Sequence, residues 1–244
     1  MKLWMKCLSL FCICAGTHAQ NGAVCFTFDD YGGENWIKAD KIFKKYNAHA
    51  TFFVMGRITK DKAGVMKKLQ AAGHTVALHS VKHINMNPLP EGWTLDTYFE
   101  QEIQPQLEDC RKYGIKVRGF AYPNNRRSDE TDAYLFKHFD FMRAGWGKTV
   151  RPLLMTHSEV NEKTLLPGGG IGTYYKSDIE VLKGYLDQAA EQNALIVFFS
   201  HDIYPDATGV HMPTDWLEGL LAHAAKRKML IIGAEELPKF RGKK

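Results

Sequence analysis

The chain has 244 residues, of which 45% are apolar and 24% are charged, and its net charge is +5. This composition excludes whole-chain disorder, and the length allows one or two domains. The charge is small and no block of Lys and Arg accompanies it, so we expect no nucleic-acid partner.

The first 19 residues have the three-part layout of a secretory signal peptide. Lys2 and Lys6 precede an apolar run at residues 7–16, and Thr17 and Ala19 supply small residues before a cleavage site. The run is too short to span a bilayer comfortably, although a short membrane anchor is the alternative. We therefore expect an exported protein, periplasmic or extracellular, with no stable membrane insertion after cleavage.

Short apolar runs alternate with segments of helical period along the rest of the chain. The runs predict strands at residues 23–28, 50–54, 75–78, 119–122, 141–143, 194–200 and 229–233. The period predicts helices at residues 36–46, 61–72, 94–113, 129–138, 178–192 and 214–227. Strands that are apolar throughout and alternate with helices indicate a parallel sheet covered by helices.

Two closures fit about seven strand–helix units: a (β/α) barrel or an open doubly wound sheet. No linker or repeat divides residues 20–244, so we expect one catalytic domain there. Residues 147–176 contain Pro167 followed by three glycines, and we interpret them as a long surface loop.

Two cysteines, Cys25 and Cys110, follow the predicted signal peptide. An exported protein could join them in one disulfide, and two buried free thiols are an equal alternative.

Polar residues follow several predicted strands, where ligands of parallel sheets bind. Asp29 and Asp30 are adjacent carboxylates that repel each other unless a cation or a shared proton relieves them. His79 and His83 are four residues apart, a spacing that can place both imidazoles on one face of a helical turn. With Asp30 they form a His, His, carboxylate set that leaves a position for water, as catalytic zinc requires.

Two further strand ends carry candidate groups. Tyr122, Pro123 and Asn124 predict a tight turn that can aim a backbone N–H into a site. His201 follows the apolar strand at residues 194–200 and is a candidate general acid.

Together these strand ends resemble the polysaccharide deacetylases with a NodB homology domain, carbohydrate esterase family four. The matching segments, in the order of the family, are FTFDD (26–30), ATFFV (50–54), HSVKH (79–83), FAYPN (120–124) and IVFFSHD (196–202). The resemblance implies a deformed (β/α) barrel of about seven strands and one divalent metal ion, usually Zn²⁺. It implies an acetylated glycan as substrate, with removal of N-acetyl or O-acetyl groups from a cell-wall or extracellular polysaccharide.

The resemblance also implies roles for single residues. Asp30, His79 and His83 would bind the metal ion, and Asp29 would be the general base that deprotonates the coordinated water. His201 would protonate the departing amine.

The resemblance implies one more role, and the position of Ser80 in the sequence suggests another. The backbone N–H of Asn124 would help to hold the oxyanion. Ser80, between the two histidines, would support a metal ligand.

The sequence departs from the family at several points, with Tyr31 in place of the usual Gly and Asn124 in place of the usual aromatic residue among them, and two departures affect the proposed catalytic roles. Ala121 stands where the family commonly has an Arg that steadies the catalytic Asp, and Arg118 or Arg143 could substitute. The segment that tunes the acidic His is not recognisable. Two alternatives therefore stay open: a weakened, glycan-binding domain, or an amidohydrolase acting on a small non-sugar amide.

Overall fold

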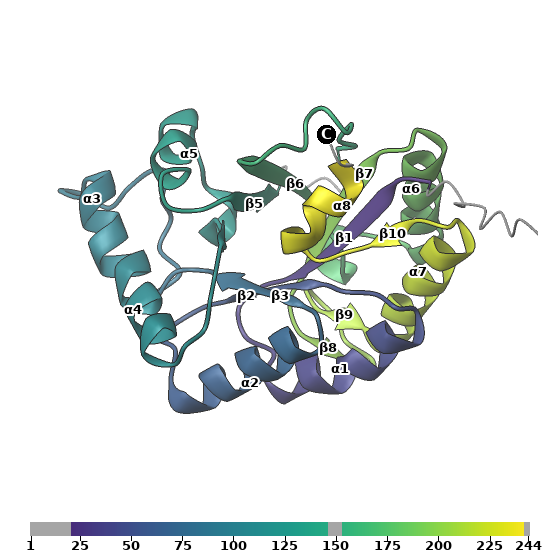
Figure 1. The fold of residues 1–244 in the computed structure, drawn as a ribbon, viewed down its shortest axis with the longest axis horizontal. Coiled ribbons are helices and arrows are strands. Elements are labelled where there is room, and N and C mark those ends of the chain that lie inside the picture. The colour runs from purple at the N-terminus through teal and green to yellow at the C-terminus, as the bar shows by residue number, and fades with distance from the viewer. Residues whose placement is uncertain (1–20, 146–152, 242–244) are drawn as a thin grey trace, which may run out of the picture.

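The computed structural model describes residues 21–145 and 153–241, so the predicted signal peptide lies outside the described residues. Seven parallel strands form a closed barrel, because β7 returns to pair with β1 along its whole length. An eighth strand, β10, pairs with the beginning of β1 (Figure 1). The strands are β1 (Ala23–Phe28), β2 (Thr51–Val54), β3 (Thr75–Leu78), β4 (Gly119–Ala121), β5 (Phe141–Gly145), β6 (Thr164–Gly170), β7 (Leu195–Ser200) and β10 (Leu230–Ile231).

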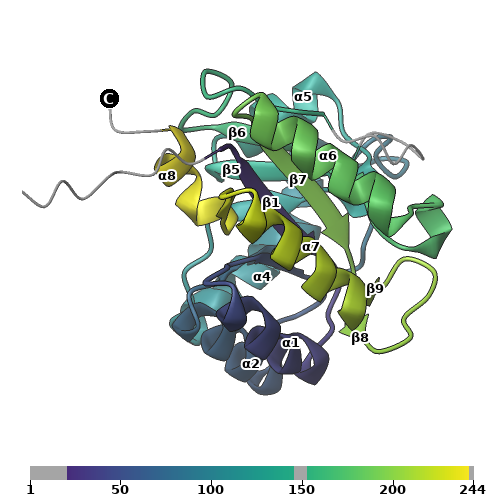
Figure 2. The same ribbon diagram turned by 90° about the vertical axis from the view of Figure 1, so that its right-hand side faces the viewer.

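Helices cover the outside of the barrel. They are α1 (Glu34–Lys45), α2 (Lys60–Ala71), α3 (Leu95–Tyr98), α4 (Gln104–Lys112), α5 (Asp129–Leu135), α6 (Ile179–Glu191), α7 (Thr214–Lys226) and α8 (Leu237–Arg241). Figure 2 shows α6 and α7 side by side outside β1 and β7. A two-stranded sheet of β8 (Ile203–Tyr204) and β9 (Met212–Pro213) follows β7 and packs beside α1.

Side chains alternate along each strand between two apolar clusters. Val24 and Phe26 of β1 face the helices, whereas Ala23 and Cys25 belong to the cluster inside the barrel. Small inward residues suit the narrow interior, and both faces are buried, which explains why the strands are apolar throughout. The inward face of β5 carries Arg143, a charged residue that is only 1% exposed.

The structure confirms the closed barrel over the open sheet and corrects which strands form it. Residues 164–170 were expected in a surface loop, but they form β6 between β5 and β7. Pro167 and its glycines usually weaken strands, and this is why the pattern failed. The predicted strand at residues 229–233 is the short β10, which lies outside the ring of seven.

The long helix predicted at residues 94–113 is also interrupted. A π-helical turn, Phe99–Ile103, separates α3 from α4. Such turns occur frequently at functional sites.

Cys25 and Cys110 are both buried and unpaired, so the free-thiol alternative is the one that the structure supports. Within residues 21–145 and 153–241, none of the helices is long and apolar enough to cross a membrane.

Candidate active site

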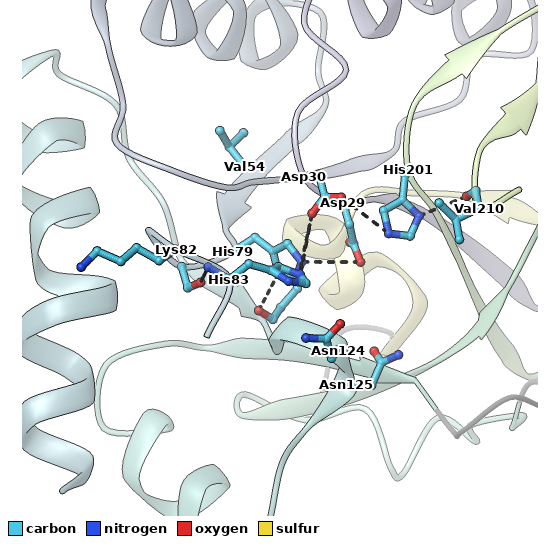
Figure 3. Close-up of polar contacts among 12 residues, drawn as sticks. Asp29, Asp30, Val54, His79, Lys82, His83, Asn124, Asn125, His201 and Val210 are labelled. Atoms are coloured by element: carbon cyan, nitrogen blue, oxygen red, sulfur yellow. Dashed lines mark hydrogen bonds and ion pairs between the residues drawn. The ribbon is translucent and has the colours of Figure 1, made fainter. Parts of the chain in front are cut away.

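A cavity of about 410 Å³ opens at the carboxyl ends of the barrel strands. Its walls come from the segments that follow β1, β3, β4, β6 and β7. The lining residues are Asp29, His79, His83, Tyr122, Asn124, Asn125, Arg126, Gly145, Tyr174, Tyr175, Phe199 and His201. In Figure 3, Asp29 and Asp30 lie between the two histidines of the HSVKH segment and His201.

Asp30, His79 and His83 bring their ligand atoms within 4.8 Å of one another. The Nε2 atoms of the two histidines are 3.1 Å apart, and Asp30 Oδ1 lies 3.6 Å and 3.8 Å from them. Asp30 Oδ1 is buried and has no hydrogen-bond partner among the described residues. Two imidazoles and an unpaired carboxylate oxygen are a donor set that suits a divalent ion such as Zn²⁺.

His79 is held in the orientation that a metal ligand needs. Its Nδ1–H donates to the carbonyl of Ala121 at 2.8 Å, which leaves Nε2 free to face Asp30. Burial lowers the pKa of His79 to about 4, so the imidazole is neutral at pH 7, which is the form that binds metals. Ser80 accepts a hydrogen bond from the backbone N–H of His83 at 2.9 Å, and both residues have positive φ.

The π-helical turn Phe99–Ile103 holds the HSVKH segment (79–83) from outside. Glu102 is fully buried, its carboxylate accepts the N–H of Lys82 at 2.7 Å, and its backbone carbonyl accepts the N–H of Val81 at 3.0 Å. The side chain of Gln106 in α4 donates to the carbonyls of Val54 and Gly56 at the end of β2. The interrupted helix therefore fixes the backbone that carries the two histidines.

Asp29 forms a buried ion pair with Arg143. Its Oδ2 accepts a hydrogen bond from Arg143 Nη2, while Nη1 of the same guanidinium donates to Asn125 at 2.6 Å. Burial alone would raise the pKa of Asp29, but the charge of Arg143 and the neighbouring His79 and His201 outweigh it. The pKa of Asp29 is therefore held below its ordinary value, and the carboxylate is ionised at neutral pH.

Arg143 occupies the space that the departure at Ala121 leaves. The two residues are register partners on β4 and β5, and both face the barrel interior. The guanidinium lies 4.8 Å from the ring centre of Phe199 and 5.4 Å from that of Phe53, in cation–π contacts. The alternative, Arg118, is wrong: its side chain is 63% exposed and pairs with Asp140, at the opposite end of β4.

His201 is held by a backbone carbonyl. Its Nδ1–H donates to Val210 at 3.1 Å, and its Nε2 lies 3.8 Å from Asp30 Oδ2. Ser200 donates its hydroxyl to the same carbonyl at 2.9 Å. The sequence offered no partner for this His, because Val210 is an ordinary apolar residue that the β8–β9 sheet brings back to β7.

The Asn124 turn forms the opposite wall. Asn124 has φ of 51° and Asn125 has φ of 58°, and the side chain of Asn124 donates to Asn85 at 2.9 Å. The backbone N–H of Asn124 donates to none of the described residues. It is thus available to an acceptor in the cavity.

A comparison with models of protein families identifies the family of this chain. The model of the family described as polysaccharide deacetylase matches residues 17–138. The chain belongs to the polysaccharide deacetylase family. That match includes the segments that carry Asp29, Asp30, the two histidines and Asn124. Arg143, Tyr175 and His201 lie beyond it in the sequence, and the fold brings them to the same site.

Individual members of the family are similar in sequence to parts of this chain. The peptidoglycan-N-acetylmuramic acid deacetylase PdaA of Bacillus subtilis is 29% identical over 104 residues, which are 42% of this chain and 36% of that protein. The chain therefore spans little more than a third of this curated relative.

Solved structures of the family share the fold over most of the chain. The peptidoglycan deacetylase PdaC of Bacillus subtilis superimposes with a TM-score of 0.61 at 16% identity, covering 91% of this chain and 92% of that one. A family-four pseudoenzyme from Bacillus anthracis superimposes with a TM-score of 0.58 at 18% identity, covering 90% and 66%. At these identities the likeness shows the barrel fold alone. The chemistry of the site has to be inferred from the active-site residues of this chain.

Sequence reasoning missed several contributors to the site, among them Glu102, Val210 and Tyr175. Glu102 lies in the segment that was predicted to be one regular helix, and Tyr175 lies in the segment that was predicted to be a surface loop. Val210 acts through its backbone. None of these features has a pattern that a single sequence shows.

Proposed function

We propose that this protein is an exported, metal-dependent hydrolase that removes acetyl groups from N-acetylated or O-acetylated carbohydrate polymers. The observation that carries the proposal is the convergence of Asp30, His79 and His83, with Asp29 and His201 on either side. The family membership supports a hydrolase of acetylated polysaccharide.

The three ligands would hold one divalent ion, with Zn²⁺ as the best fit to two imidazoles and one carboxylate. When bound, such an ion polarises a carbonyl and lowers the pKa of a coordinated water towards about 7 in favourable zinc sites. Asp29 would accept a proton from the attacking water, because Arg143 keeps its carboxylate ionised at neutral pH.

His201 would deliver a proton from Nε2 to the departing nitrogen, or to the departing oxygen of an ester. Its Nδ1–H is committed to the Val210 carbonyl, and so the imidazolium form of His201 would give up the proton of Nε2, the nitrogen that faces the cavity. The free N–H of Asn124 would donate to the acetyl oxygen as negative charge develops there. Water and the amide become acetate and a free amine.

Export is the second part of the proposal. It is supported by the lysines, apolar run and small residues of positions 1–19. The related PdaA and PdaC are named as deacetylases of peptidoglycan, a polymer outside the cell membrane, and a cell-wall glycan is the first substrate class to test.

The test is acetate release by the mature chain, beginning at Gln20, from chitooligosaccharides, purified peptidoglycan and acetylated xylan. We expect release that EDTA abolishes, that Zn²⁺ restores, and that Asp29→Asn lowers by at least about 100-fold, as loss of a general base does. Turnover of small amides alone would favour the amidohydrolase alternative. Glycan binding without turnover in either form would favour the binding-domain alternative, for which the family-four pseudoenzyme is a precedent of fold.

A further inference from the structure

Tyr175 places a phenol in the cavity that none of the roles above uses. It ends a short 3-10 turn, Thr173–Tyr175, after β6. Its side chain lines the cavity with Asp29 and His201. The residue was expected in an unstructured loop, so nothing in the sequence pattern singled it out.

The aromatic ring of Tyr175 is held in place on two sides. It packs edge-on against Phe199 of β7, with ring centres 5.3 Å apart. On the other side it covers Gly170, where an added Cβ would lie 2.6 Å from the ring. The absence of a side chain at Gly170 therefore makes the space in which the ring sits.

The backbone of the turn is fixed as well. The Tyr174 N–H donates to the Gly209 carbonyl at 2.8 Å, and Thr173 Oγ1 accepts the Gly209 N–H at 2.6 Å. The turn is thereby joined to the segment that presents Val210 to His201. A ring that is fixed by both its packing and its backbone can present a hydroxyl at a defined position.

The hydroxyl of the partly buried Tyr175 has no hydrogen-bond partner among the described residues, unlike the hydroxyls of the two fully buried tyrosines Tyr98 and Tyr122. Tyr98 donates to the Ile84 carbonyl and Tyr122 donates to Asp132, each at 2.8 Å. Burial, and next the carboxylate of Asp29, raise the pKa of Tyr175 to about 12. The phenol is therefore protonated at neutral pH and remains a donor.

We propose that Tyr175 donates a hydrogen bond to the acetyl oxygen of the substrate and so shares with the Asn124 N–H the stabilisation of the oxyanion. The two groups come from the walls after β6 and β4 and line the same cavity. An acetyl carbon attacked by water that Asp29 deprotonates would lie in the cavity that both Asp29 and Tyr175 line. This inference rests on the proposed deacetylation.

The test compares Tyr175→Phe with the wild type and with Tyr185→Phe as the matched control, since Tyr185 lies in α6 away from the cavity. Phe keeps the ring and its packing, so the variant is expected to fold and to bind one Zn²⁺ with wild-type affinity. We expect kcat on chitopentaose, or on whichever glycan the wild type deacetylates, to fall about 100-fold, as for other oxyanion donors. KM should change less than about threefold, because the interaction strengthens in the transition state.

If the wild type is active, two results would overturn the inference. A kcat within about twofold of the wild type would show that the hydroxyl does not act in the transition state. A smaller loss of kcat, together with an acidic limb of the pH profile that is displaced from that of the wild type, would show that Tyr175 positions Asp29 instead. A wild type without any deacetylation would refute the proposed function itself, and the inference with it, whereas an active wild type isolates the effect of the hydroxyl.

Discussion

Arg143 and Asp29 form an ion pair inside the barrel, from strands on different sides of the ring, and each side chain is less than 5% exposed. Removing one partner of a buried pair leaves the other charge without compensation, and this is costly. The pair therefore couples the candidate base to a residue more than a hundred positions later in the chain.

We expect Arg143→Met to move the acidic limb of the kcat/KM profile to higher pH. Without the guanidinium, burial dominates and raises the pKa of Asp29, so the base is protonated over a wider acidic range. Activity at pH 6 should fall more than activity at pH 8. The measurement is the pH profile of acetate release by the Zn²⁺-loaded protein.

Arg118→Met is the matched control, because Arg118 is exposed and pairs with Asp140 away from the cavity. It should keep the wild-type profile and lose at most about 1 kcal/mol of stability, the usual size of an exposed pair. Equal profiles for Arg143→Met and the wild type would contradict the assignment of Arg143 to Asp29.

The proposed ligand set of Asp30, His79 and His83 leads us to expect a thermal shift when zinc binds. Zinc at a hundred times its dissociation constant should stabilise the protein by about 2.7 kcal/mol, and calorimetry should give one ion per chain. His83→Ala should remove most of that shift, because one of three ligands is lost. His49→Ala should keep it, since His49 binds Glu236 far from the site. A full zinc shift in His83→Ala would refute the proposed ligand set.

Glu102→Ala should weaken both the fold and zinc binding. The Lys82 N–H would be left without its acceptor, which costs about 1–3 kcal/mol when such a group is buried. The HSVKH segment would then be less well ordered, and the zinc affinity should fall with it. Glu102→Gln keeps an oxygen acceptor and should recover part of both losses.

Glu100→Ala, in the same π-helical turn but exposed, is the control for Glu102. Urea unfolding and zinc titration are the two measurements. If Glu102→Ala lowers stability but leaves zinc affinity unchanged, the hydrogen bonds of Glu102 stabilise the fold and do not support zinc binding.

Gly170→Ala should disturb the cavity although glycine-to-alanine changes often stabilise proteins. The new Cβ would lie 2.6 Å from the Tyr175 ring, and such overpacking costs about 1–3 kcal/mol. Gly64→Ala in α2 is the contrasting change, since nothing lies within 4 Å of the added carbon. It should stabilise the protein by about 0.5–1 kcal/mol, and thermal unfolding would distinguish the two. A Gly170→Ala protein as stable as Gly64→Ala would contradict the packing of Tyr175.

Much of this molecule could be predicted from local patterns. The strands at residues 23–28 and 75–78 have the predicted bounds, because a strand buried on both faces is a continuous apolar run. The Asp30, His79 and His83 set was also visible, since parallel strands bring their carboxyl ends to one edge.

The remaining features depend on contacts between distant segments. From the sequence, Arg143 and Arg118 are equally plausible partners of Asp29. Only the fold shows that the side chain of Arg143 on β5 points into the barrel and reaches Asp29. Likewise β6 looks like a loop because its glycines are strand breakers. They are tolerated there because Gly168 leaves space for Arg143 and Phe199, and Gly170 for Tyr175.

The sequence by itself thus determined the strand–helix alternation and the residue types at the strand ends, because both follow from local periodicity and burial. The tertiary structure decided which strands close the barrel, which arginine neutralises Asp29, and what holds His201. Those are choices among partners far apart in the chain, and their energies arise only when the barrel closes and removes water from around the charges.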